Sequence, residues 1–239
     1  MDFDGKVFLE ALTSRSLIQG VQLTIELTVV AFLVGIVIGL LVAVMRDSRI
    51  RFLRALSWTY VWLFRGIPTL ILLFIVWFAL PQLVPALRER WFTPFLAATI
   101  ALSFNEAAYA AEILRGGLLS VDEGQRLAAR ALGMPPFKVF SKVVAPQLTR
   151  VTIPPMANDF ITLLKITSLA SVTSLRELMT NTQAAVSSSF RFAEWYFAAA
   201  IYYLVVVSIF MVAQSWLERR YVWTSAARGP RSLIRAIGR

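Results

Sequence analysis

Long apolar segments alternate with shorter polar intervals along most of this chain. A helix that crosses a lipid bilayer needs about 20 mostly apolar residues. Five segments approach this requirement, at about residues 18–45, 56–80, 94–114, 151–172 and 195–217. The pattern predicts an all-α membrane protein with five transmembrane helices, forming a single transmembrane domain over residues 1–239.

The basic residues predict the orientation of these segments, because cytoplasmic loops carry an excess of Lys and Arg. Of the 24 basic residues, sixteen lie on one side of the predicted bundle, within 46–54, 115–150 and 219–239, and six lie on the other. The N-terminus is therefore predicted outside and the C-terminus inside. Arg65 and Lys165 remain within predicted segments. We expect Arg65 to snorkel to the cytoplasmic face, with a gating role as the alternative.

The longest polar interval, at about residues 120–147, is then cytoplasmic and predicts a helix–turn–helix. Ser120 and Glu123 have the spacing of a capping box at the start of the first helix. Gly133 suits the end of that helix, where positive φ is readily adopted. Pro146 is expected to end the second helix.

One side of the first of these two helices is apolar and carries Leu127, Ala128 and Leu132. Two interpretations are open for such a face. It packs on the cytoplasmic ends of the protein's own helices, or it docks into a groove of another protein, as amphipathic helices often do.

The amino-acid composition excludes several classes of function. The chain is 58% hydrophobic, well above the share typical of soluble domains. Its net charge of +10 does not indicate nucleic-acid binding, because the basic residues lie in loops between apolar segments and are better explained by the lipid surface. The chain has no Cys and no His, which excludes disulfides, the usual zinc sites and His-based catalysis.

Polar side chains within the apolar segments are candidates for a transport pathway. Ionisable residues at bilayer depth are disfavoured by roughly 2.5–3.5 kcal/mol on insertion scales, so they are functional candidates by default. Two helix faces carry them: Asn105, Tyr109 and Glu112 with Glu106 beside them, and Asn158, Thr162 and Lys165 with Asp159 beside them. Two interpretations are open for these faces. In the first, they line a substrate pathway, and Lys165 or Asn105 contacts the substrate. In the second, they hold helices together through pairs such as Lys165 with Glu106 or Glu112.

The 120–147 interval resembles the EAA loop of ABC-importer permeases. The family pattern is Glu-Ala-Ala, three residues, Gly, nine residues, then Ile-x-Leu-Pro. Ala128, Ala129, Gly133 and Pro146 match it at that spacing, and Leu127 stands where the Glu would be. Further stretches over most of the chain are similar to the polar amino-acid and opine permeases of this family, among them YVWLFRGIPTLILLF and APQLTRVTIPPMANDFITLLKITSLASV.

The resemblance implies a permease subunit of an ATP-driven importer in the bacterial plasma (inner) membrane. The loop would couple to a separate ABC ATPase through Gln125, Leu127, Ala128, Ala129, Leu132 and Gly133. The chain has no P-loop, so we expect no cofactor on it, with ATP and Mg on the partner ATPase. A second permease, either an identical copy or a paralogue, would complete the pathway. An extracytoplasmic binding protein would deliver a polar amino acid.

Other functions remain as alternatives. Within the importer class, the cargo could instead be a related small solute such as an opine or a compatible solute. A membrane enzyme is disfavoured because the chain lacks His and any metal-ligand cluster. A stand-alone channel would conduct ions as the purified chain alone, whereas an importer would transport only with its ATPase and binding protein.

Overall fold

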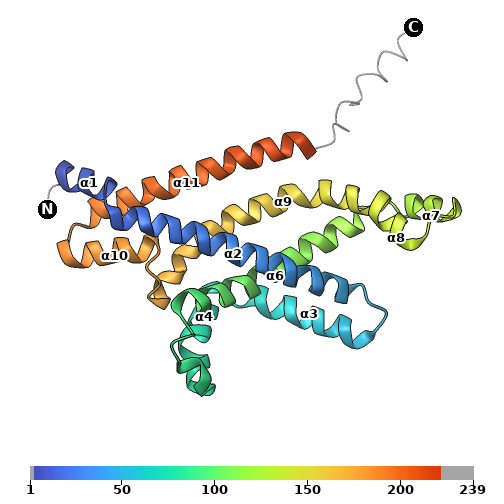
Figure 1. Cartoon of the computed structure of the whole chain (residues 1–239), viewed down its shortest axis with the longest axis horizontal. Helices are drawn as coiled ribbons and strands as arrows, with labels where there is room; N and C mark the ends of the chain where they lie inside the picture. Colours follow the sequence, from blue (N-terminus) through green and yellow to red (C-terminus); the bar gives the residue numbers. More distant parts are fainter. Residues whose placement is uncertain (1–2, 222–239) are drawn as a thin grey trace, which may run out of the picture.

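The computed structural model describes residues 3–221, and within them the regular structure is entirely helical. Four long helices run roughly along the long axis of the molecule (Figure 1): α2 (Arg15–Arg46), α6 (Pro94–Leu119), α9 (Ala145–Ile166) and α11 (Phe192–Tyr221). The shorter helices are α1 (Gly5–Leu12), α3 (Arg51–Gly66), α4 (Thr69–Phe74), α5 (Leu80–Leu83), α7 (Glu123–Ala131), α8 (Pro136–Val139) and α10 (Leu178–Ser189).

Two of the described helices, α2 and α11, are long and apolar enough to cross a bilayer by length and composition alone. The bent pair formed by α3 and the helical stretch from Thr69 to Leu83 is a third candidate if both parts make one span. The predicted third and fourth segments correspond to α6 and α9, whose polar side chains lower their hydropathy. The all-helical membrane fold is confirmed, while the number of five spans and their orientation stay predictions.

The second predicted segment, 56–80, is not one helix. α3 ends at Gly66, and the chain turns by 101° before α4 begins at Thr69. Pro68 causes the break, because it has no N–H to donate and it restricts the preceding Ile67 to an extended conformation, with φ −92° and ψ 128°. Pro81, which directly follows the predicted segment, lies in the first turn of α5, so the chain stays helical up to Leu83.

Helix α2 packs tightly against α6 through small residues. A Cβ atom at Gly35 would lie 2.6 Å from Cγ of Glu106, and one at Gly39 would lie 2.8 Å from Cβ of Ala110. Since real Cβ atoms do not approach other heavy atoms this closely, only glycine allows this spacing of the two helices. The two-glycine pattern of the first segment is therefore a helix-packing feature.

The predicted second helix of the polar interval does not end at Pro146. From Pro136 the chain stays helical through α8, a π-helical turn at Phe140–Val144 and α9, which ends at Ile166. Pro146 lies directly after this π-helical turn, and the helix passes through it. Within the predicted fourth segment, 151–172, the residues up to Ile166 belong to α9 and the last ones form a 3₁₀ turn at Thr167–Thr173.

Candidate functional site

Glu106 on α6 and Asp159 on α9 form a pair of carboxyl groups inside the bundle. Glu106 is only 3% exposed and occupies the space that Gly35 leaves open on α2. The Asp159 carboxyl group lies against that of Glu106. One oxygen of each, Oε1 and Oδ2, has no hydrogen-bond partner within residues 3–221. The two predicted faces of α6 and α9 therefore meet at this pair.

Asn105 stabilises the break between α3 and α4 through hydrogen bonds. In a continuous helix the Phe64 carbonyl would accept a hydrogen bond from the residue four positions later, which is Pro68 and has no N–H. Nδ2 of Asn105 donates to that carbonyl at 2.8 Å, and its Oδ1 accepts from Oγ1 of Thr69 at 3.3 Å. Asn105 is buried, and both ends of its amide bind the protein itself.

Glu112 on α6 is the centre of an arginine cluster. Its carboxylate lies 3.5 Å from Nη1 of Arg46 on α2, 3.9 Å from Nη1 of Arg65 on α3 and 3.3 Å from Nη2 of Arg115 on α6. The Arg65 guanidinium also lies 5.2 Å from the centre of the Tyr109 ring. Arg65 therefore pairs with α6, and one carboxylate links the ends of three helices.

The remaining predicted pathway residues lie apart from these pairs. Asn158 and Lys165 are exposed on α9, and the Thr162 hydroxyl donates to the Asn158 carbonyl within the same helix at 3.1 Å. Within the described residues, Lys165 pairs with neither Glu106 nor Glu112, so the proposed structural pairing of Lys165 is not formed. Lys165 and Asn158 are accessible on this face, as a substrate contact requires.

The polar interval folds as a hairpin of α7 and α8, as predicted, but its first cap differs. Ser120 ends α6 by donating to the Gly117 carbonyl, so it does not start α7. Asp122 caps α7 instead, accepting from the Gly124 N–H at 2.6 Å. The capping-box prediction was therefore wrong, because the start of α7 follows a sharp turn that the spacing alone does not reveal.

The end of α7 confirms the role predicted for Gly133. Its φ is +75°, a left-handed conformation that glycine adopts without a Cβ penalty. The N–H groups of Gly133 and Met134 donate to the carbonyls of Arg130 and Ala129, which is the hydrogen-bond pattern of a Schellman motif. The chain thereby reverses sharply between α7 and α8.

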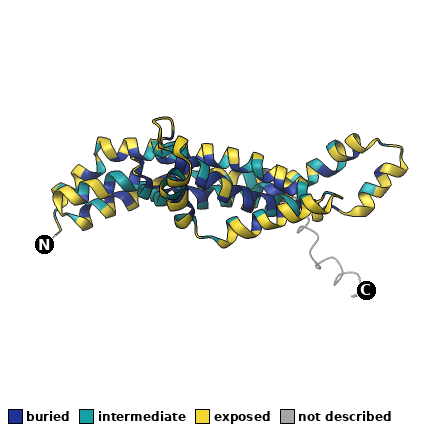
Figure 2. Cartoon of the chain, turned by 90° about the horizontal axis from the view of Figure 1, so that it is seen from below, coloured by how far each residue is buried: buried dark blue, intermediate teal, exposed yellow. Residues whose placement is uncertain are grey.

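The hairpin projects from one end of the bundle, and much of it is coloured as exposed in Figure 2. Leu132 is 83% exposed and Phe137 is 79% exposed. Leu127 and Ala128 are also exposed, whereas Ala129 is buried. Most of the apolar side predicted for α7 therefore does not pack on the protein's own helices.

Two contacts that the sequence did not reveal fix the hairpin to the bundle. Nη2 of Arg126 donates to the Leu118 carbonyl at the end of α6, and Nε2 of Gln147 on α9 donates to Oε1 of Gln125 at 2.6 Å. Gln125, predicted as a docking residue, thus also has a structural partner. Both contacts join residues on different helices, so no local sequence pattern predicts them.

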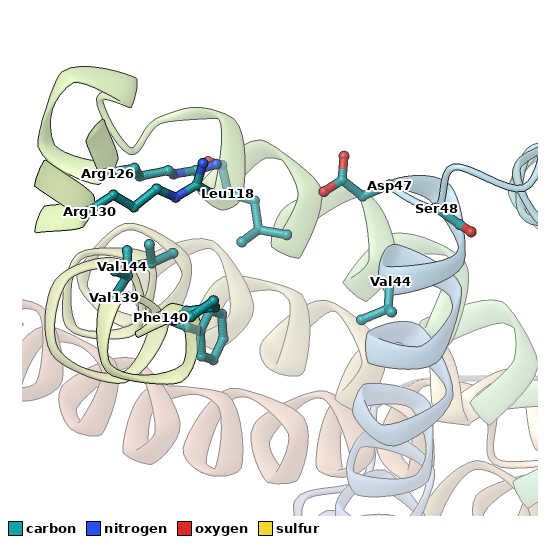
Figure 3. A pocket seen from close by; sticks show the side chains of 10 residues that line it. Val44, Asp47, Ser48, Leu118, Arg126, Arg130, Val139, Phe140 and Val144 are labelled. Atoms are coloured by element: carbon teal, nitrogen blue, oxygen red, sulfur yellow. The ribbon is translucent and has the colours of Figure 1, made fainter. Parts of the chain in front are cut away.

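A cavity of about 480 Å³ separates the hairpin from the end of α2. Figure 3 shows Arg126 and Arg130 lying side by side above Val139, Val144 and Phe140, with Asp47 and Ser48 on the opposite wall. The cavity has both charged and apolar walls. The hairpin is therefore held at its root and free of contact along part of its inner side.

Comparison with known families identifies the chain. Residues 35–223 match the family described as "Binding-protein-dependent transport system inner membrane component". The probable amino-acid permease protein YxeN of Bacillus subtilis is 38% identical over 204 residues, covering 85% of this chain and 90% of that protein. The octopine transport system permease protein OccM of Rhizobium radiobacter is 37% identical over 219 residues, covering 87% of this chain and 89% of its own.

Solved structures support the same fold. A chain from the crystal structure of an amino acid ABC transporter with histidines superposes with a TM-score of 0.83 at 31% identity, covering 92% of this chain and all of that chain. A chain of the MetNI methionine ABC transporter, in an inward-facing conformation, superposes with a TM-score of 0.68 at 22% identity and covers 87% of this chain. The second likeness concerns the fold alone.

Proposed function

Since this chain belongs to the family of binding-protein-dependent transport system inner membrane components, we propose that it is the permease subunit of an ATP-driven importer for a polar amino acid or an opine. The names of its relatives support this class of cargo, because they include permeases for amino acids and for octopine. In this proposal a binding protein delivers the solute, and separate ABC ATPase subunits bind and hydrolyse ATP with Mg.

The α7–α8 hairpin is the observation that carries the coupling role. Its exposed Leu132 and Phe137 would enter a cleft of the ATPase, and the Schellman turn at Gly133 keeps the two helices at a fixed angle. Burying such side chains at an interface stabilises it by about 1.5–3 kcal/mol each. Movement of the ATPase would then reach α9 directly, because α8 continues into α9 without a break.

Reconstitution with the ATPase and binding-protein subunits encoded beside this chain tests the coupling role. Leu132→Ser should lower substrate-stimulated ATP hydrolysis and uptake at least about tenfold, as the loss of one buried leucine predicts. Leu83→Ser is the control, because Leu83 is 77% exposed at the end of α5, away from the hairpin. Uptake by Leu132→Ser equal to that of Leu83→Ser would rule out the hairpin as the coupling element.

Five passages through the membrane follow from the proposal, with the N-terminus outside and the broken α3–α4 pair as the second passage. Because the chain has no Cys, single cysteines can be placed on a clean background. Ser188→Cys on α10 should react with a membrane-impermeant maleimide added outside intact spheroplasts, and Glu123→Cys on α7 should react only after lysis. The reverse pattern would invert the topology.

The exposed polar side chains of α9 are the substrate contacts in this proposal. Lys165 would bind the carboxylate of an amino acid, with Asn158 and Tyr109 along the same route. Lys165→Met should therefore raise KM for uptake without changing the thermal stability of the chain. An unchanged KM and rate would remove Lys165 from the pathway. A second permease copy or a similar paralogue facing this side would complete the route.

A further inference from the structure

Three arginines from three helices meet around a small cavity at the root of the α7–α8 hairpin. The cavity measures about 270 Å³. Its polar wall consists of Arg46 and Asp47 at the end of α2, Arg115 near the end of α6 and Arg126 of α7, and apolar side chains of α2 and α6 complete it. It lies beside the larger cavity of Figure 3 and shares Arg126 and Asp47 with it.

Each of these arginines has a buried nitrogen without a hydrogen-bond partner in the described part of the chain. The atoms are Nε of Arg115, Nε of Arg126 and Nη1 of Arg46, which lies 3.5 Å from the Glu112 carboxylate in an ion pair. A buried donor without an acceptor destabilises a protein by about 1–3 kcal/mol, and by more when it is charged. All three arginines line the same cavity, so their positive charges are brought together around it.

The charges around the cavity favour an anion over a neutral acceptor. Glu112 is the carboxylate that pairs with Arg46 and Arg115, and it also faces Arg65. Among the residues that the structure describes, Arg126 donates only to a neutral carbonyl, that of Leu118. Asp47 is exposed and forms no ion pair within residues 3–221. Water would satisfy the donors and leave the positive charge, whereas an oxyanion satisfies both.

We propose that this cavity binds an oxyanion of the phosphate or carboxylate type, held by Arg46, Arg115 and Arg126. The phosphate of an anionic phospholipid is one source, because the cavity lies at the ends of membrane helices and has Leu119, 71% exposed, on its wall. A soluble phosphate ester is the other. In either case the bound anion links the ends of α2 and α6 to α7 and so fastens the hairpin to the bundle.

Native mass spectrometry of the purified, delipidated full chain tests the site directly, because each bound molecule is resolved by mass. The probes are dioleoylphosphatidylglycerol, dioleoylphosphatidylcholine with the same acyl chains, and sn-glycerol 3-phosphate. Preferential retention of one phosphatidylglycerol over phosphatidylcholine identifies the lipid as the source. Retention of glycerol 3-phosphate at equal concentration identifies the soluble ester. Equal retention of the two lipids, with no glycerol 3-phosphate bound, overturns the proposal without any variant.

Matched variants distinguish anion binding at this cavity from attraction by the general surface charge. Arg46→Gln should weaken retention of the preferred probe about tenfold, as expected for the loss of one charge-assisted hydrogen bond. Arg46→Lys keeps the charge, loses the planar fork and should lie between Arg46→Gln and the wild type. Arg130→Gln is the control, since Arg130 is on α7 one turn after Arg126 and does not line this cavity. An equal loss in Arg130→Gln would mean that bulk charge alone attracts the anion.

Discussion

The α2–α6 interface and the α7–α8 hairpin carry the same types of small residue for opposite purposes. At the interface, Gly35 and Gly39 lie against Glu106 and Ala110 so closely that no other side chain fits. In the hairpin, a Cβ at Gly133 would meet nothing within 4 Å, and the glycine is needed for its positive φ alone. A glycine motif thus indicates packing in one region and backbone conformation in the other.

The two regions also differ in which side chains they bury and which they expose. The interface buries the carboxyl group of Glu106 beside that of Asp159, whereas the hairpin exposes Leu132 and Phe137. An ionisable group in the interior and apolar groups on the surface both reduce stability, so each indicates a use other than stability. The first would serve passage through the bundle and the second would serve contact with a partner.

The largest expected effect is at the interface. Gly35→Leu should destabilise the chain by about 3 kcal/mol, because the new side chain has no space between α2 and Glu106. Thermal unfolding of the purified protein in detergent, followed by tryptophan fluorescence, measures it. Gly116→Leu is the control, since a Cβ at Gly116 of α6 meets nothing within 4 Å. Equal melting temperatures for the two variants would contradict the close α2–α6 contact.

The next effect concerns the helix break. Asn105→Leu should lower the free energy of unfolding by about 1–3 kcal/mol. The Phe64 carbonyl would lose its hydrogen bond from Asn105, and Pro68 has no N–H to replace it. Asn158→Leu, at an exposed position of α9, should change it little. If Asn105→Leu instead left stability intact and altered only KM, Asn105 would be a substrate contact and not a structural residue.

A smaller effect is expected in the hairpin turn. Gly133→Ala should destabilise the hairpin by about 1–2 kcal/mol, because alanine in the left-handed region brings its Cβ close to the following carbonyl oxygen. Hydrogen exchange of the α7 amides should speed up, while that of α6 stays unchanged. Faster exchange in both helices would show that the hairpin and the bundle unfold together.

The smallest effect is expected where the hairpin departs from the family pattern. Leu127→Glu restores the acidic residue of the EAA pattern and places it three positions before Arg130 on α7. Such a pair stabilises a helix by about 0.2–0.5 kcal/mol. Uptake in the reconstituted importer should stay within about twofold of the wild type, since 0.4 kcal/mol corresponds to that ratio. A loss as large as that of Leu132→Ser would show that Leu127 itself enters the partner.

Pattern reasoning located the long helices because apolar runs and helix length are local properties. It located the Gly133 turn for the same reason, since one residue determines it. It failed at Pro146, which was expected to end a helix. Pro68 does break one, whereas the helical chain from Pro136 to Ile166 passes through Pro146 directly after a π-helical turn.

In the candidate site, too, the sequence predicted the residues and only the structure revealed their partners. Glu106, Asp159, Tyr109 and Glu112 were predicted from polarity within apolar segments. Some of their partners come from helices far away in the chain, as with Arg46 beside Glu112 and Asp159 beside Glu106. Long flexible arginine side chains reach several neighbours, so their pairing is decided only when the helices have packed.

The sequence by itself determined that the chain is a helical membrane protein, which of its faces are polar and where the hairpin turns, because hydrophobic periodicity and backbone preference act over a few residues. The tertiary structure alone decided which carboxyl groups meet, which arginines surround the cavity at the hairpin root and which leucines stay exposed. Those outcomes depend on distances between helices, and the packing of side chains such as Glu106 against Gly35 sets these distances.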